Sequence, residues 1–219
     1  MFCLSNIDKE IDKLINKGCN VKIAKLSMLY PNIKMNYVDD KFIAYKVLGD
    51  SEDIIFPNEV ELLTKQILGA RFNIHTITLP SSLKCIDSFA FKDCINLNYI
   101  KMTIFGSNNV IFKNNIFENC ISLESIEIAE GVKSLGSFCF RNCRKLQSIS
   151  LPSTLEVIGD YCFSNCLNLD AIDIPKSVTC IGDSIFDGCS CYINITCHTE
   201  EIYNLLKSSM SVINNIVLV

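Results

Sequence analysis

The chain has 219 residues, of which 49% are hydrophobic and 20% charged, and its formal net charge is −4. This composition can build a sizeable core and is not that of a disordered chain. The Lys and Arg residues form no block, so no nucleic-acid footprint is visible, and no apolar run approaches the ~18 residues of a membrane helix.

The first 40 residues are interpreted as a small helical N-terminal region. Residues 5–18 carry apolar side chains at the spacing of a helix face. Residues 21–29 form either a second short helix or a strand, and Tyr30-Pro31 ends it. The N-terminus has no basic segment followed by an apolar one, so it does not read as a secretory signal, and we expect a cytoplasmic location.

The next segment, Lys41 to Leu48, is rich in β-forming residues and stops at Gly49-Asp50-Ser51, which predicts a strand and a turn. Residues 77–190 then contain five copies of one pattern, and each copy ends in a phenylalanine followed three residues later by a cysteine. These cysteines stand 26, 23, 23 and 23 residues apart, at Cys94, Cys120, Cys143, Cys166 and Cys189. Such a period indicates a solenoid.

Residues 41–195 are therefore predicted to form about six coils, the first of them degenerate, because Ile54 stands 23 residues before Ile77. If the first Ile of a copy is position 0, apolar residues recur at positions 0, 2, 6, 9, 12, 14, 17 and 20. Positions 0 and 2 predict a strand with alternating faces. Glycine at position 10 (Gly136, Gly159, Gly182) predicts a corner with a positive φ. Stacking should align the phenylalanines of position 14 in one ladder and the repeat cysteines in another.

The last 24 residues, 196–219, are predicted to cap the solenoid. A final repeat strand spans residues 192–197, and Thr199 can cap the helix that follows. That helix should place Ile202, Leu205, Leu206 and Met210 on one face, and residues 215–219 should form a closing strand.

Thirteen cysteines and two histidines are the residues that raise the question of chemistry. Most cysteines obey the repeat offset, which core packing explains without bridges or metal. The dense group of Cys180, Cys189, Cys191 and Cys197 is the best place for an exception, including a catalytic one. No carboxylate partner is evident for His75 or His198, and there is no phosphate loop or metalloprotease motif. We therefore expect no enzyme, no cofactor and no metal.

Residues 149–169, Ile-Ser-Leu-Pro-Ser-Thr-Leu-Glu-Val-Ile-Gly-Asp-Tyr-Cys-Phe-Ser-Asn-Cys-Leu-Asn-Leu, and their neighbouring copies resemble the BspA-like leucine-rich repeat, also called the Treponema pallidum-type repeat. The resemblance covers roughly residues 54–195, and its Asn-Cys and Tyr-Cys-Phe steps are closer to the protist members than to the bacterial ones. It implies an α/β-type, strand-rich, right-handed leucine-rich-repeat superhelix. It also implies adhesion at a surface or protein scaffolding, without catalytic residues.

The outward positions on either side of position 0 form two rows along the predicted strand face. They are either a plain solvated surface or a protein-binding strip with an aromatic anchor and flanking charges. We predict a non-catalytic scaffold that binds protein partners, with a cell-surface adhesin as the alternative. A further alternative is that residues 1–40 carry the specific contact. The predicted strip consists of Tyr99, Lys101, Ser125, Glu127, Ser150 and Asp173.

Overall fold

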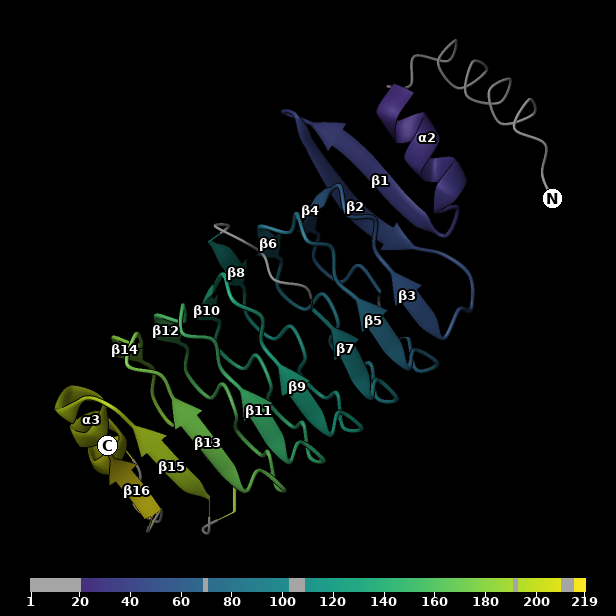
Figure 1. Ribbon diagram of the computed structural model, residues 1–219. Coiled ribbons are helices and arrows are strands. Elements are labelled where there is room, and N and C mark those ends of the chain that lie inside the picture. Colours follow the sequence, from purple (N-terminus) through teal and green to yellow (C-terminus); the bar gives the residue numbers. More distant parts are fainter. Residues whose placement is uncertain (1–20, 69–70, 103–108, 191–192, 210–214) are drawn as a thin grey trace.

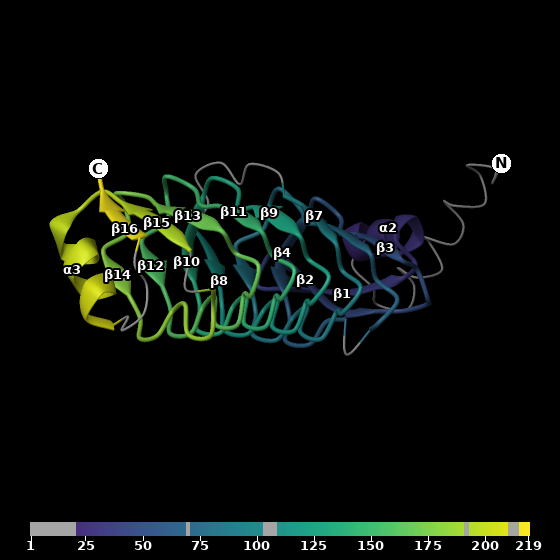
Figure 2. The ribbon, with the colours of Figure 1, turned by 90° about the horizontal axis from the view of Figure 1, so that it is seen from below.

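The computed structural model describes residues 21–68, 71–102, 109–190, 193–209 and 215–219. It is a strand-rich solenoid of about seven turns, in which successive coils lie side by side from an N-terminal hairpin to a C-terminal helix (Figure 1). Seen from below, two rows of strands run along the length of the stack (Figure 2). The predicted helix over residues 5–18 lies outside the described residues.

The N-terminal end of the described chain is a helix followed by a hairpin. Helix α2 (Val21–Leu29) leads into strands β1 (Ile33–Val38) and β2 (Lys41–Val47), which pair antiparallel. The interpretation of residues 1–40 as helical is wrong for β1, where Ile33 and Met35 are buried and the residues between them are exposed. This alternation is the pattern of a strand that covers a core with one face.

The predicted repeat strands form a row of parallel strands, which we call the strand face. The register pairs Ile54 with Ile77 and Ile77 with Ile100, so the degenerate first coil is confirmed. Position 0 points into the core, and its two neighbours point outward, as the alternation predicts. The strands are β3 (Asp53–Ile55), β5 (Thr76–Thr78), β7 (Tyr99–Lys101), β9 (Ser125–Glu127), β11 (Ser148–Ser150), β13 (Ala171–Ile174), β15 (Asn194–Cys197) and β16 (Asn215–Leu218).

A second sheet, which the sequence did not predict, forms a continuous wall of eight strands in the order β1-β2-β4-β6-β8-β10-β12-β14. Several of its strands have only two residues, around repeat positions 8 and 9, and so carry no alternation that a sequence could reveal. Beyond the hairpin, its strands are β4 (Val60–Leu63), β6 (Cys85–Ile86), β8 (Val110–Phe112), β10 (Val132–Leu135), β12 (Val157–Ile158) and β14 (Cys180–Ile181).

The remaining side of each coil is a series of turns that also hydrogen-bonds to the next coil. The N–H groups of Phe138, Phe140 and Asn142 each donate to a carbonyl of the following coil at 2.8 Å. Residues at positions 12 and 16 reach this arrangement with a positive φ. At position 16 the chain uses Asp, Asn or Gly, which tolerate that conformation better than other residues.

The glycines of position 10, Gly136, Gly159 and Gly182, do not have a positive φ, so that prediction is wrong. The glycines with a positive φ in the described chain are Gly49, Gly131 and Gly188. At Gly159, a Cβ atom would lie 2.4 Å from the backbone N of Ser137 in the preceding coil. Glycine at position 10 is therefore required because neighbouring backbones approach closely there.

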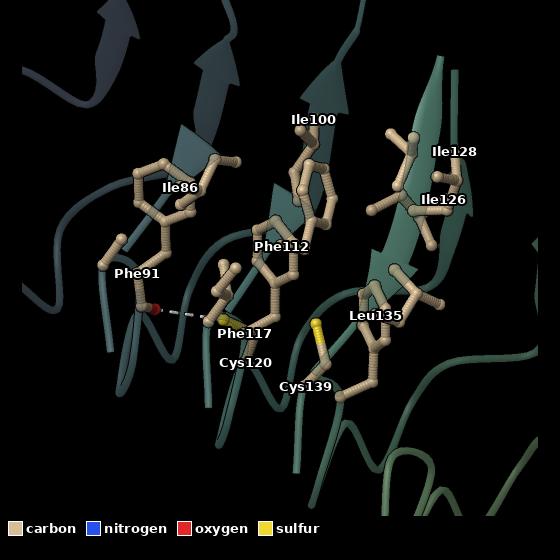
Figure 3. Close-up of a cluster of buried hydrophobic side chains, with 14 of the residues drawn as sticks. Ile86, Phe91, Ile100, Phe112, Phe117, Cys120, Ile126, Ile128, Leu135 and Cys139 are labelled. Carbon is tan, nitrogen blue, oxygen red and sulfur yellow. Dashed lines mark hydrogen bonds between the residues drawn. The ribbon is translucent and has the colours of Figure 1, made fainter. Parts of the chain in front are cut away.

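The core contains the predicted phenylalanine ladder. Centroids of successive rings are 5.2 to 5.8 Å apart along the column, and four of the five rings have no solvent exposure. Figure 3 shows Phe91 and Phe117 pointing inward beside the aliphatic side chains of both sheets. The column consists of Phe91, Phe117, Phe140, Phe163 and Phe186.

The cysteine ladder runs beside the phenylalanines and hydrogen-bonds to their backbone. Four of the five thiols donate to the carbonyl of the ladder phenylalanine one coil earlier, as Cys120 does to Phe91 at 3.4 Å (Figure 3) and Cys143 to Phe117 at 3.2 Å. Cys166 and Cys189 repeat the contact at 3.3 and 3.0 Å. Cysteine fits this position because it is small and apolar and still offers a weak donor to a buried carbonyl.

Helix α3 (Glu200–Ser209) covers the C-terminal end of the stack. The Thr199 hydroxyl accepts the Ile202 N–H at 3.3 Å, as expected of an N-cap. Ile202 and Leu206 are buried, whereas Leu205 is exposed, so its predicted place on the packed face is wrong. Met210 lies outside the described residues, and β16 forms the predicted closing strand.

We expect Phe140→Ala to lower the free energy of unfolding by about 3–5 kcal/mol, because it removes a ring from the middle of a dry column. Urea denaturation of the full chain measures this. Phe72→Ala is the matched control, since that ring is 54% exposed and its loss should cost no more than about 0.5 kcal/mol. Equal losses in the two variants would contradict the ladder's role.

Candidate protein-interaction site

All six residues of the predicted strip are exposed on the strand face, on β7, β9, β11 and β13. Tyr99 is the largest of them, and its side chain is 56% exposed. The register of β9 and β11 sets Glu127 beside Ser150 and Ser125 beside Ser148. The structure thus gathers the strip on one surface, while its role in binding stays a prediction.

The strand face is interrupted within the strip. β7 ends a three-stranded sheet and β9 begins a five-stranded one, and no ladder joins these two strands in the part of the chain that the structure describes. On the other wall, β8 pairs with both β6 and β10, so the eight-stranded sheet continues past the break. The break coincides with the one repeat whose cysteine spacing is 26 rather than 23 residues.

A groove of about 400 Å³ lies at this interruption. Tyr99 and Met102 line it from the β7 side, and residues of β9, β11 and the turns after them line the remainder. Met102 and Leu151 are half-buried, whereas the equivalent residues Leu79 and Ile128 are buried. The lining residues are Tyr99, Ile100, Met102, Ser125, Ile126, Glu127, Ile128, Ala129, Glu130, Ser150, Leu151 and Pro152.

Sequence analysis placed Tyr99, Ser125, Glu127 and Ser150 correctly on this surface but missed the groove. Met102 and Leu151 occupy position 2, which reads as core in every copy, so nothing in their own pattern marks them as accessible. The signal that could have found the groove is the longer second repeat. Three additional residues in one coil can break the alignment that gives each strand its partner.

The charged residues that line the groove are both acidic. Ser153 holds the Glu130 carboxylate, because its N–H donates to Oε1 at 2.9 Å and its hydroxyl to Oε2 at 3.1 Å. No ion pair or hydrogen bond joins the Glu127 side chain to a described residue. Lys101 is exposed on β7 but does not line the groove.

Both histidines have carboxylate partners, contrary to the expectation from sequence. His198 Nε2 lies 2.8 Å from Asp173 Oδ1 at the C-terminal end of the strip, and His75 Nδ1 lies 3.4 Å from Glu52 Oε2. Each pair joins two consecutive coils of the solenoid. Among the described residues, neither imidazole is hydrogen-bonded to a thiol.

The thiols of the ladder are held in their protonated form. Burial raises the pKa of the Cys94 thiol to about 12 and that of Cys189 to about 11, and it raises the pKa values of Cys120, Cys143 and Cys166 as well. A thiol in this state is a poor nucleophile and a poor metal ligand. All ten cysteines in the described ranges are free, and those ranges contain no group of three or more metal-ligating side chains.

One buried charge cluster is structural. The Glu118 side chain is only 8% exposed and forms ion pairs with Lys92 at 2.7 Å and Arg141 at 3.8 Å, one from the coil before and one from the coil after. Asn115 donates a hydrogen bond to the same carboxylate at 2.9 Å. These contacts compensate the buried charge and tie three coils together.

The fold and this surface define a solenoid repeat protein. The model of the BspA-type leucine-rich repeat region matches residues 42–115 and 110–217 in six copies, so the chain belongs to the BspA-type leucine-rich repeat family. The predicted family and fold class are thereby confirmed. No curated protein matches the chain.

Solved structures of bacterial repeat proteins share the fold. A leucine-rich cell surface protein from Faecalibacterium prausnitzii is 21% identical with a TM-score of 0.56, and the match covers 77% of this chain and 54% of that one. The T. pallidum leucine-rich repeat protein is 21% identical with a TM-score of 0.53, and the match covers 77% and 69%. A leucine-rich repeat protein from Bacteroides ovatus is 20% identical with a TM-score of 0.54, and the match covers 77% and 52%. This chain thus spans about half the length of the first and third proteins.

Neither helix in the described ranges has the length and apolar character needed to span a membrane.

We expect stability to fall as the pH rises above 9. The Cys94 thiol loses its proton near pH 9 in the unfolded chain and near pH 12 in the folded one. The contribution of this thiol to the free energy of unfolding is therefore fully present below pH 9. It falls by about 1.4 kcal/mol per pH unit between pH 9 and pH 12.

Urea denaturation under reducing conditions from neutral to alkaline pH measures this slope. Cys94→Ala should reduce the slope by about 1.4 kcal/mol per pH unit, because the other ladder thiols keep their contributions. Phe140→Ala, which destabilises the chain without removing a thiol, should keep the slope. An unchanged slope in Cys94→Ala would contradict the buried, protonated state of this thiol.

Proposed function

We propose that this protein is a non-catalytic scaffold that binds a partner protein on the strand face. The observation that carries the proposal is the set of exposed side chains gathered around the groove between β7 and β9. Tyr99 offers a large ring at the rim, and Lys101 and Glu127 have no ion-pair partner among the described residues. Exposed aromatic anchors with uncommitted charges around them are typical of protein-binding surfaces.

The absence of reactive groups around the groove supports a binding role over catalysis. The described residues of its lining combine aliphatic, aromatic, hydroxyl and carboxylate side chains, and none of them is a cysteine, histidine or lysine. The two histidine pairs lie outside it. Leucine-rich repeats generally serve as protein-interaction scaffolds, and regular curved surfaces are how solenoid proteins bind partners.

Site-specific photo-crosslinking tests the location of the binding surface. A benzophenone amino acid replaces Ser150 on the strand face or, as the control, Thr179 beside the eight-stranded sheet, and the chain is irradiated in its native cells. We expect a discrete adduct from position 150 that is absent from position 179. Adducts from position 179 alone would move the site to the other wall.

The Tyr99→Ala, Lys101→Glu double variant tests the residues. It should reduce the yield of the adduct at position 150 about tenfold or more, because it removes the anchor and inverts a charge. The matched control, Ile111→Ala with Thr179→Glu, changes exposed residues on the other wall and should keep the yield. A retained adduct in the first variant would contradict the assignment of Tyr99 and Lys101.

The second candidate function is adhesion at a cell surface. It competes with the internal scaffold, for which we propose a cytoplasmic location. Adhesion is favoured by the similar fold of the F. prausnitzii protein, which is described as a cell surface protein. An antibody against the folded chain, applied to intact and to permeabilised cells, separates the two. Staining of intact cells supports the adhesin, and staining only after permeabilisation supports an internal scaffold.

A further inference from the structure

The groove between β7 and β9 lies where two neighbouring strands of the strand face are not joined by a ladder in the described chain. In the described part of the chain, each interior strand of a sheet is hydrogen-bonded on both sides, but β7 is paired only with β5 and β9 only with β11. The two strands nevertheless remain in contact, so the gap between them is too narrow for a third strand to lie within the sheet. A partner segment therefore lies over the groove and inserts side chains into it.

The side chains around the groove divide into an apolar base and an acidic rim. Ile126 and Ile128 of the β9 segment are nearly buried at the base, and Tyr99, Met102 and Leu151 are accessible above it. Glu127 is exposed, and Glu130 is held in place by Ser153. Since both charged lining residues are carboxylates, the groove disfavours acidic segments and nucleic acid and favours a positive charge.

We propose that the groove takes an extended segment of a partner protein in which a Lys or Arg stands next to an apolar residue. This rests on the proposed function and specifies the chemistry of the partner. The segment lies over the groove, its apolar side chain packs against Tyr99, Met102 and Leu151, and its cation pairs with Glu127. Alternation along an extended chain places neighbouring side chains on opposite sides, so that one enters the groove while the next reaches its rim.

The size of the groove is consistent with this occupant. A volume of about 400 Å³ lies toward the lower end of the ~300–1,000 Å³ of ligand pockets, which suits the insertion of individual side chains rather than a folded element. The base is preformed, because Ile100, Ile126 and Ile128 belong to the contiguous core of the solenoid. Binding therefore orders the incoming segment without requiring the repeat to refold.

Selection from a random decapeptide library displayed on phage, with the full chain immobilised, tests the proposal. We expect the enriched sequences to carry Lys or Arg beside an apolar residue. A fluorescein-labelled synthetic copy of the most enriched peptide is then measured by fluorescence anisotropy. Its affinity should fall about tenfold or more in Glu127→Lys and should decrease as salt is raised.

The matched control is Glu201→Lys, which makes the same change in net charge at an exposed position of α3, far from the groove. It should keep the affinity within about threefold of the unmodified chain. Failure to enrich any sequence, enrichment of acidic sequences, or equal losses in Glu127→Lys and Glu201→Lys overturns the proposal. Photo-crosslinking at position 150 separates failure of this proposal from failure of the proposed function. If the peptide test fails but a partner adduct still forms at position 150, the strand face remains the binding surface. Only the basic, extended segment is then ruled out as its occupant.

Discussion

The structure depends on hydrogen bonds between the backbones of consecutive coils. Along the turns each coil donates N–H groups to the next, as Phe140 does to Cys162, whereas along the eight-stranded wall N–H groups also donate to the preceding coil, as Gly159 does to Leu135. These bonds fix like residues of neighbouring coils beside one another. A single coil cannot bury its own apolar residues, so its stability comes from its neighbours. The alignment of equivalent residues is therefore the constraint from which the ladders follow.

Each ladder solves a different problem that this alignment creates. Stacked phenylalanines fill the core, and the thiols beside them satisfy carbonyls with a small side chain. In the turns, Asn142 donates to Asn119 at 2.8 Å and accepts from Asn165 at 3.1 Å, so the residues that tolerate a positive φ also bond to one another. At Gly188 this ladder ends, because glycine has no side chain, and the side-chain Oδ1 of Asn165 occupies the space 2.1 Å from where a Cβ would lie.

The sequence was sufficient to predict the features that follow from the repeat period and from the alternation of inward and outward residues. It was insufficient for the features that depend on distances between neighbouring coils. Ile54, Phe140 and Cys143 were placed correctly because their roles recur at a fixed spacing. Gly159 was recognised as special for the wrong reason, since crowding by a neighbouring backbone leaves no local pattern. The groove beside Met102 arises from a strand pairing that is missing, and a sequence does not show which pairs fail to form. Leu205 has the spacing of a packed residue, but α3 buries only the side that faces the stack.

The interruption between β7 and β9 gives the solenoid an unequal stiffness. At this point one wall is held by the bonds of β8 to both of its neighbours, while on the opposite wall no ladder joins β7 to β9 among the described residues. The phenylalanine column passes the same level without a gap. Bending about the intact wall therefore changes the width of the groove without breaking a ladder between described strands.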